Sequence, residues 1–140
     1  MTPDLASLLP HAGDMVLIER VIAVDEHHIL CETDSHRRTD NPLRRDDRLH
    51  AVALLEYAAQ CMGIHGALTG GEGQARIAFL AAARDVTLHV ETLHGLPGTL
   101  RLRADKLLDT PGGVIYDTAA MHEDHCLMRA RLTVMHPQAH

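Results

Sequence analysis

One carboxylate lies within the most apolar stretch of the chain. Residues 51–68 read AVALLEYAAQCMGIHGAL, in which Glu56, Gln60 and His65 are the strongly polar side chains. Ionising an unpaired carboxylate in apolar surroundings is costly, so the sequence predicts a raised pKa for Glu56 or a partner for it. Gln60 lies one helical turn later, at i+4, and could hydrogen-bond to it. The pattern suits a proton donor, although a structural Glu–Gln pair or a glutamate bound to an arginine across an interface fits as well.

The chain has 12 histidines against two tyrosines and one phenylalanine. His36 falls where a predicted strand ends and His50 at the entrance of the predicted helix, so either could enter a cleft at the helix N-terminus. Taken alone, each is expected at the surface. His65 follows Glu56 by nine residues, about 180° round a helix, and is not expected to share its site. Other histidines are expected to be solvated residues of turns, without a third ligand for a metal. They are His27, His28, His122 and His125.

Five arginines gather just before this helix, in the segment HRRTDNPLRRDDR at residues 36–48. In a chain of net charge −6 this is a local basic patch. Planar guanidinium groups could bind a phosphate or an acidic partner there. A solvated loop paired with its own aspartates is an equal alternative. The arginines are Arg37, Arg38, Arg44, Arg45 and Arg48, and the nearby acids are Asp34, Asp40, Asp46 and Asp47.

The elements that position these residues follow from the hydrophobic pattern. β-branched stretches predict a long strand over residues 15–24, with residues 29–35 as its hairpin partner. The apolar run predicts a core helix over 51–68, ended by the glycine-rich residues 69–73. Four further strands are expected in an antiparallel meander, at residues 76–90, 99–108, 114–121 and 126–135. The fold class is α+β, a sheet wrapped around one buried helix.

Length and composition exclude several classes of protein. The 140 residues suit one domain spanning 1–140. Negative net charge and few aromatic rings argue against nucleic-acid binding. No apolar run reaches the roughly 20 residues of a membrane span, and no export segment is visible, so a cytoplasmic protein is expected. Cys31, Cys61 and Cys126 lie far apart, which argues against a disulfide framework and a zinc site.

Several segments of the chain also match the pattern of one enzyme family. They are LLPH at residues 8–11 with MVLIERV at 15–21, NPL at 41–43, and HAVALLEYAAQ at 50–60. They resemble the LPHR…LLVDRV, NxPFF and PGVLxxEAxAQ motifs of the hot-dog-fold 3-hydroxyacyl-acyl-carrier-protein dehydratases. Glu56 and Gln60 fall on the acidic and glutamine positions of the last motif. The likeness covers nearly the whole chain and is strongest to the dehydratases of aryl-polyene and related pigment pathways.

The resemblance implies a mechanism and a set of partners. A histidine removes the proton alpha to the thioester, and Glu56 protonates the departing 3-hydroxyl group. The two residues come from opposite subunits of a homodimer, and no metal or organic cofactor takes part. The substrate is a thioester on acyl carrier protein, whose phosphopantetheine phosphate would meet Arg44 and Arg45. Asn41 and Gln60 belong to the substrate-binding motifs. The backbone N–H groups near Ala51–Ala53, with Ala51 and Val52 as the first candidates, could hold the enolate oxygen.

One family motif is missing. The catalytic histidine normally lies in GHFPG between the NxPFF segment and the helix, but residues 44–49 hold no histidine. The base is therefore His36, His50 or another group, or it is absent. Two alternatives to the dehydratase follow: a thioesterase of the same fold in which Glu56 activates water, and a degenerate subunit that binds carrier protein or supports an active relative.

Overall fold

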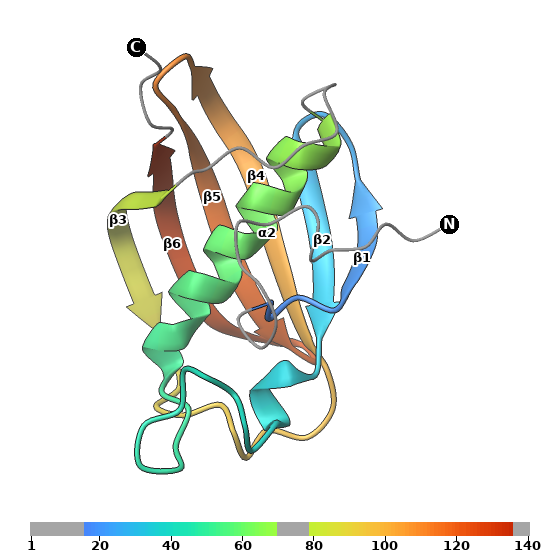
Figure 1. The fold of residues 1–140 in the computed structure, drawn as a ribbon, viewed down its shortest axis with the longest axis vertical. Coiled ribbons are helices and arrows are strands. Elements are labelled where there is room, and N and C mark those ends of the chain that lie inside the picture. The colour runs from blue at the N-terminus through green and yellow to red at the C-terminus, as the bar shows by residue number, and fades with distance from the viewer. Residues whose placement is uncertain (1–15, 70–78, 136–140) are drawn as a thin grey trace.

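A computed structural model describes residues 16–69 and 79–135 of the chain. They form one six-stranded antiparallel sheet and one long helix, in the order two strands, helix, four strands (Figure 1). The predicted α+β class and this order are both confirmed. The strands are β1 (Arg20–Val24), β2 (His28–Thr33), β3 (Phe79–Leu88), β4 (Leu100–Thr110), β5 (Gly113–His122) and β6 (His125–Met135).

The helix crosses the concave face of the sheet (Figure 1). It begins with the 3-10 turn η3 (Ala51–Ala53) and continues as α2 (Leu54–Thr69), close to the predicted bounds. Its buried side chains include Tyr57, Cys61 and Ile64, each without solvent exposure. Burying apolar side chains in this way supplies most of the stability of such a helix.

The sheet is not the simple meander predicted. Strands β4, β5 and β6 follow one another as hairpins, but the order across the sheet is β1-β2-β4-β5-β6-β3. The chain leaves the helix into β3 at the far edge, beside β6, and then crosses back to place β4 beside β2. Hairpin spacing predicts neighbours only where a short turn joins two strands, and residues 89–99 are a longer connection.

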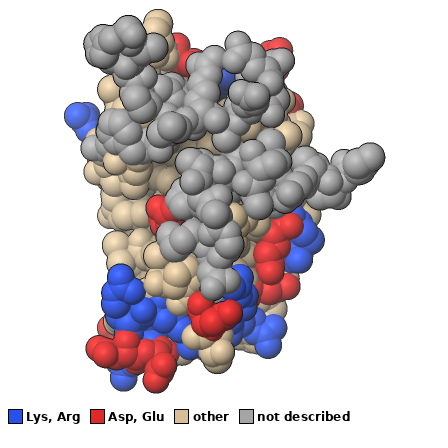
Figure 2. Space-filling view, in the orientation of Figure 1, with Lys and Arg blue, Asp and Glu red and all other residues tan. Residues whose placement is uncertain are grey.

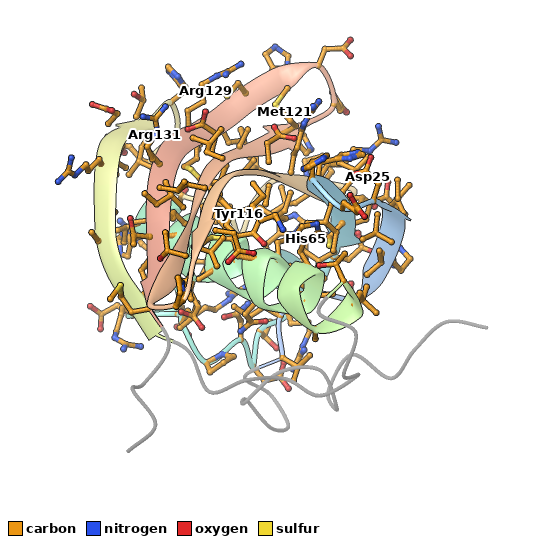
Figure 3. The ribbon with its side chains drawn as sticks, turned by 90° about the horizontal axis from the view of Figure 1, so that it is seen from above. Asp25, His65, Tyr116, Met121, Arg129 and Arg131 are labelled. Carbon is orange, nitrogen blue, oxygen red and sulfur yellow. The ribbon has the colours of Figure 1, made fainter. Side chains whose placement is uncertain are left out.

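Buried and exposed residues alternate along the strands, so the sheet has one buried face and one exposed face. In β4, Leu100, Leu102 and Ala104 are buried, whereas Arg101 and Arg103 are exposed. An antiparallel sheet with one face on the core and one in water has this pattern. Figure 3 shows Met121, Arg129 and Arg131 on the side of the sheet away from the helix.

The first strand is shorter than predicted. Regular pairing with β2 starts at Arg20 and is interrupted by a bulge between Val21 and Ala23. Residues 16–19 have no strand conformation, and position 15 lies outside the described residues. Hydrogen bonds to other elements nevertheless hold this segment. The Leu17 N–H donates to Gln60 Oε1, and Glu19 accepts the backbone N–H of Asp34 at its side chain and donates its own N–H to Glu32 O.

Three segments meet at the end of the molecule where the helix begins. They are the 3-10 turn η2 (Ser35–Arg37), the loop at residues 38–50 and the β3–β4 connection at residues 89–99. The Ala51 N–H donates to Glu91 O at 2.9 Å, and the Leu93 N–H donates to Leu49 O at 2.8 Å. These bonds fix the entrance of the helix against the connection.

Within the described ranges, no helix is long and apolar enough to cross a membrane. The same residues contain no cluster of three or more histidine, cysteine, aspartate or glutamate side chains placed to hold a metal ion.

Candidate active site

Glu56 lies in the first turn of α2, half-buried, with the partner expected for it. The Gln60 Nε2 group donates to Glu56 Oε1 at 3.4 Å. Gln60 is itself buried, and its Oε1 accepts the backbone N–H of Leu17 at 2.8 Å. Because an amide that accepts at its oxygen must present its NH₂ group elsewhere, this second bond orients the donor toward the carboxylate. The i+4 pair predicted from the sequence is confirmed, and Leu17 is its third member.

His36 lies in η2 and is fully buried. Its Nε2 lies 3.0 Å from the carbonyl oxygen of Leu96. A carbonyl can only accept, so Nε2 carries the hydrogen and Nδ1 carries the lone pair. Within the described part of the chain, Nδ1 is buried and has no hydrogen-bond partner. Burial lowers the pKa of His36, opposed in part by the Leu96 bond, so the ring favours the neutral form. It is therefore a base with its acceptor nitrogen unused.

His50 occupies a different environment. It is exposed, caps η3 with extended backbone dihedrals, and makes no side-chain capping bond. Its backbone forms a bridge with Thr92 in the β3–β4 connection. His36 is thus built into the fold at this end of the molecule, whereas the His50 ring faces solvent.

Two of the amides considered for an enolate oxygen are already used by the fold. The N–H of Ala51 donates to Glu91 O at 2.9 Å, and the N–H of Ala53 donates to His50 O at 3.0 Å. This corrects the expectation for Ala51, because its hydrogen points to the β3–β4 connection. Val52 is the remaining candidate of the three, and its side chain is 59% exposed.

Asn41 is a buried structural residue, in place of the substrate contact expected for it. Its Nδ2 donates to Ser35 O at 2.9 Å and to Tyr57 Oη at 3.0 Å. Its Oδ1 accepts the backbone N–H of Leu43 at 2.9 Å. An amide with these three bonds holds the loop to η2 and the helix.

Tyr57 joins the same polar group from the helix side. Its Oη lies 2.8 Å from Ser35 Oγ, and Ser35 Oγ donates to Leu17 O at 2.7 Å. Ser35 donates its one hydroxyl hydrogen to Leu17 O, so Tyr57 is the donor in the bond between Tyr57 Oη and Ser35 Oγ. Burial raises the pKa of Tyr57, which keeps this hydroxyl protonated.

The arginine loop makes most of its contacts with its own backbone. Arg44 donates to Asp47 O at 3.2 Å and Arg37 O at 3.3 Å, and Arg45 donates to Arg44 O at 3.0 Å. Arg38 forms an ion pair with Asp40 at 3.1 Å. Figure 2 shows both signs of charge gathered at this end of the molecule. The loop is therefore held mainly by its own backbone carbonyls and by the Arg38–Asp40 pair, and Arg45 remains exposed.

The other histidines correct one expectation. His125 is exposed, as predicted for a turn, but His122 is buried and its Nε2 bonds to Pro97 O at 2.5 Å. His65 lies at the far end of the helix, between Tyr116 Oη at 2.6 Å and Asp25 O at 2.7 Å. Figure 3 shows His65 and Tyr116 between the helix and the sheet. His65 is thus separate from the Glu56 end, as its spacing predicts.

Sequence reasoning missed Ser35 and Tyr57. A tyrosine hydroxyl inside an otherwise apolar helix was the available signal, because a buried hydroxyl needs a partner. Its partners could not be named, since Ser35 and Asn41 are 22 and 16 residues away and reach it only through the fold.

Comparisons with known proteins agree on the fold. A structure titled the dehydratase heterocomplex ApeI:P from Xenorhabdus doucetiae matches with a TM-score of 0.82 at 23% identity, covering 96% of this chain and 91% of that one. A hypothetical thioesterase with coenzyme A from Streptococcus pneumoniae TIGR4 matches with a TM-score of 0.61 at 12% identity, covering 84% of each chain. A mutant of the thioesterase PA1618 from Pseudomonas aeruginosa gives 0.59 at 15% identity, covering 83% of this chain and 78% of that one. The predicted hot-dog fold is confirmed.

A family model adds what these structures cannot give at such low identities. No curated protein matches the sequence. Residues 3–140, nearly the whole chain, match the model of the ApeP-like family, which is described as ApeP dehydratase. The chain therefore belongs to the ApeP-like dehydratase family.

Proposed function

We propose that this chain removes water from 3-hydroxyacyl thioesters on acyl carrier protein and yields trans-2-enoyl thioesters, in aryl-polyene or fatty-acid biosynthesis. The observation that carries the proposal is the orientation of Glu56 by Gln60, which is fixed in turn by the Leu17 backbone. A held carboxyl group at the start of a helix suits a proton donor for a departing hydroxyl.

His36 is the base in this proposal. Its Nδ1 takes the proton from C2 of the substrate, and the electron pair moves into the thioester as an enolate. The pair then returns to form the C2–C3 double bond while the C3–O bond breaks. Glu56, in its carboxylic acid form, protonates the departing hydroxyl, which leaves as water. The proton on His36 then returns to Glu56, which restores both groups. The neutral, tautomer-fixed ring supports this role better than the exposed ring of His50 does.

The substrate enters from the charged end of the molecule. The exposed arginines of the 38–50 loop would contact the phosphate of the phosphopantetheine arm, and Arg45 is the more open of the two first considered. Gln60 orients the acid, so it contributes through Glu56. The Val52 amide is the proposed donor to the enolate oxygen.

The test is a mass measurement on a carrier-bound 3-hydroxyacyl substrate. Dehydration leaves the acyl chain on the carrier and removes one water, whereas a thioesterase releases the free carrier thiol. Glu56→Gln should abolish water loss while the fold is kept. Glu26→Gln, the same change at an exposed turn residue, is the matched control and should retain full turnover. Wild-type turnover in Glu56→Gln would refute the proposed role of Glu56.

A second candidate is a subunit that needs a different partner for activity. It is favoured by the absence of a histidine at residues 44–49 and by the similar structure whose title describes a heterocomplex of dehydratases. In that case the purified chain should bind carrier protein and dehydrate nothing until a second hot-dog subunit is added.

A further inference from the structure

We propose that Tyr57 is a positioning residue for dehydration, whose hydroxyl holds the turn bearing His36 at a fixed place on the helix bearing Glu56. The inference rests on the proposed function. It starts from a juxtaposition along the chain: Tyr57 directly follows Glu56, and Ser35 directly precedes His36. The hydrogen bond between Tyr57 Oη and Ser35 Oγ, at 2.8 Å, therefore joins the immediate neighbours of the two reacting residues.

The contact is buried and geometrically determined. Tyr57 and Ser35 have no solvent exposure, and Asn41 Nδ2 donates to the same Tyr57 oxygen at 3.0 Å and to Ser35 O at 2.9 Å. One amide thus bridges the tyrosine hydroxyl and the backbone of η2. A short 3-10 turn has few hydrogen bonds of its own, so such external bonds decide where it sits.

The same hydrogen-bonded residues also connect to Glu56, through Leu17 and Gln60. Ser35 Oγ donates to Leu17 O, while the N–H of Leu17 binds the Gln60 oxygen that orients the amide toward Glu56. Tyr57 is therefore connected to Gln60 through Ser35 and through the two backbone groups of Leu17, its carbonyl and its N–H. Loss of the Tyr57 hydroxyl would loosen both the turn of His36 and the support of Glu56.

This role does not depend on which chains share a site. Tyr57 sets the position of η2 on its own helix, and a two-fold dimer repeats that geometry in both subunits. If His36 of one chain acts with Glu56 of another, a shift of η2 caused by loss of the Tyr57 hydroxyl displaces His36 in both sites of the dimer.

The test compares the two tyrosines of the chain. Tyr57→Phe removes one buried hydroxyl beside the site, and Tyr116→Phe removes another that is bonded to His65 at the far end of the helix. Misplacement of reacting groups lowers turnover, so Tyr57→Phe should reduce kcat about 10- to 100-fold with little change in KM. Tyr116→Phe should lose comparable stability and keep kcat. Equal kcat values in the two variants would overturn the proposal.

A double-mutant cycle separates positioning from general loss of packing. Ser35→Ala removes the other side of the same hydrogen bond, so Ser35→Ala/Tyr57→Phe should be no slower than the worse single variant. Ser35→Ala/Tyr116→Phe should keep the kcat of Ser35→Ala alone, while the losses of stability from the two substitutions add. Multiplied effects in the first pair would contradict a shared role.

A second readout needs no turnover. Nuclear magnetic resonance titration of His36, assigned with His36→Gln, should show its pKa rising toward the ordinary value in Tyr57→Phe, because a loosened turn admits water. The groups that act on this ring are Asp34, Arg37, His122 and the Leu96 carbonyl, and none of them is changed. An unaltered His36 titration in Tyr57→Phe would refute the inference. Turnover in Glu56→Gln would instead refute the proposed function, so the two failures are distinguishable.

Discussion

The two nitrogens of His36 are used in different ways, and this division decides which histidine to test. Nε2 donates to Leu96 O, whereas Nδ1 is buried without a partner among the described residues. A buried acceptor with no hydrogen bond costs about 1–3 kcal/mol. The proposed role as base would give this nitrogen a partner in the substrate, which makes His36 the first histidine to test.

At this residue, His36→Gln should abolish dehydration, since glutamine keeps a donor for Leu96 but supplies no base. His50→Gln should retain nearly full kcat, because that ring is exposed at the start of η3. Steady-state rates with the carrier-bound substrate measure both. If His50→Gln is inactive and His36→Gln is active, the base is His50, at the entrance of the helix.

Mixing the dead variants shows how the site is shared. If His36 of one subunit acts with Glu56 of the other, a refolded mixture of His36→Gln and Glu56→Gln chains contains dimers with one intact site. About a quarter of the sites should then be active. If both residues act within one chain, the mixture should stay inactive.

Local spacing predicts the acid but not its surroundings. The Glu56–Gln60 pair is a matter of i+4 geometry, which the sequence displays directly. His36 could be named as a candidate but not chosen over His50, because burial and the Leu96 contact arise from a segment 60 residues away. Asn41 resembled a substrate residue because a motif records identity and not contacts.

Among the elements, the two edges of the sheet differ in a way that bears on assembly. β1 has only five residues, and a short edge strand discourages a further strand from pairing. Irregular pairing does not distinguish the two edges, because it interrupts β1 once and β3 twice. β3 has ten residues, and its exposed apolar side chains are Leu80, Val86 and Leu88, each 37–40% exposed. A long, apolar edge is suited to pairing with a second chain. We propose that two copies of the chain form a homodimer through β3.

Charged residues on this edge should therefore dissociate the dimer. Val86→Lys/Leu88→Lys should shift the protein from twice the mass of one chain to a single chain in light scattering. Val24→Lys on β1, where Val24 is 42% exposed, is the control and should remain dimeric. A dimer that survives the β3 substitutions would place the interface elsewhere.

Element bounds were more predictable than their arrangement. The helix and the last three strands agree with the pattern within a few residues, because each has a strong local period. β3 lies beside β6 and not beside β4 because residues 89–99 cross from one side of the sheet to the other. Nothing in the composition of those residues predicts that crossing.

At the scale of the whole molecule, buried histidines make stability depend on pH. Burial lowers the pKa of both His36 and His65 in the folded chain. The unfolded chain binds protons at its ordinary histidine pKa, about 6.5, so it holds more protons than the folded chain below that pH. The free energy of unfolding should therefore fall as pH drops from 7 through 6 toward the lowered pKa values.

Urea unfolding at several pH values measures this loss. His65→Gln should flatten the dependence between pH 7 and 5, whereas His125→Gln, at the exposed first residue of β6, should leave it unchanged. A separate loss is expected in strong acid, because the bond to His28 holds the pKa of Asp25 at about 2. If the free energy of unfolding depends on pH equally in the His65→Gln and wild-type chains, burial of His65 is not a source of the pH dependence.

The peptide unit of Leu17 has a consequence for how this site can be studied. Its N–H fixes Gln60 and its carbonyl receives Ser35, so the contribution comes from main-chain atoms that every residue except proline possesses. Alanine scanning does not detect such a contribution, because truncating the Leu17 side chain leaves the backbone N–H and carbonyl in place. Replacing the Leu17 N–H by an ester oxygen, through chemical synthesis, would remove the donor to Gln60 and keep the Leu17 carbonyl that accepts from Ser35, so it would measure this contribution.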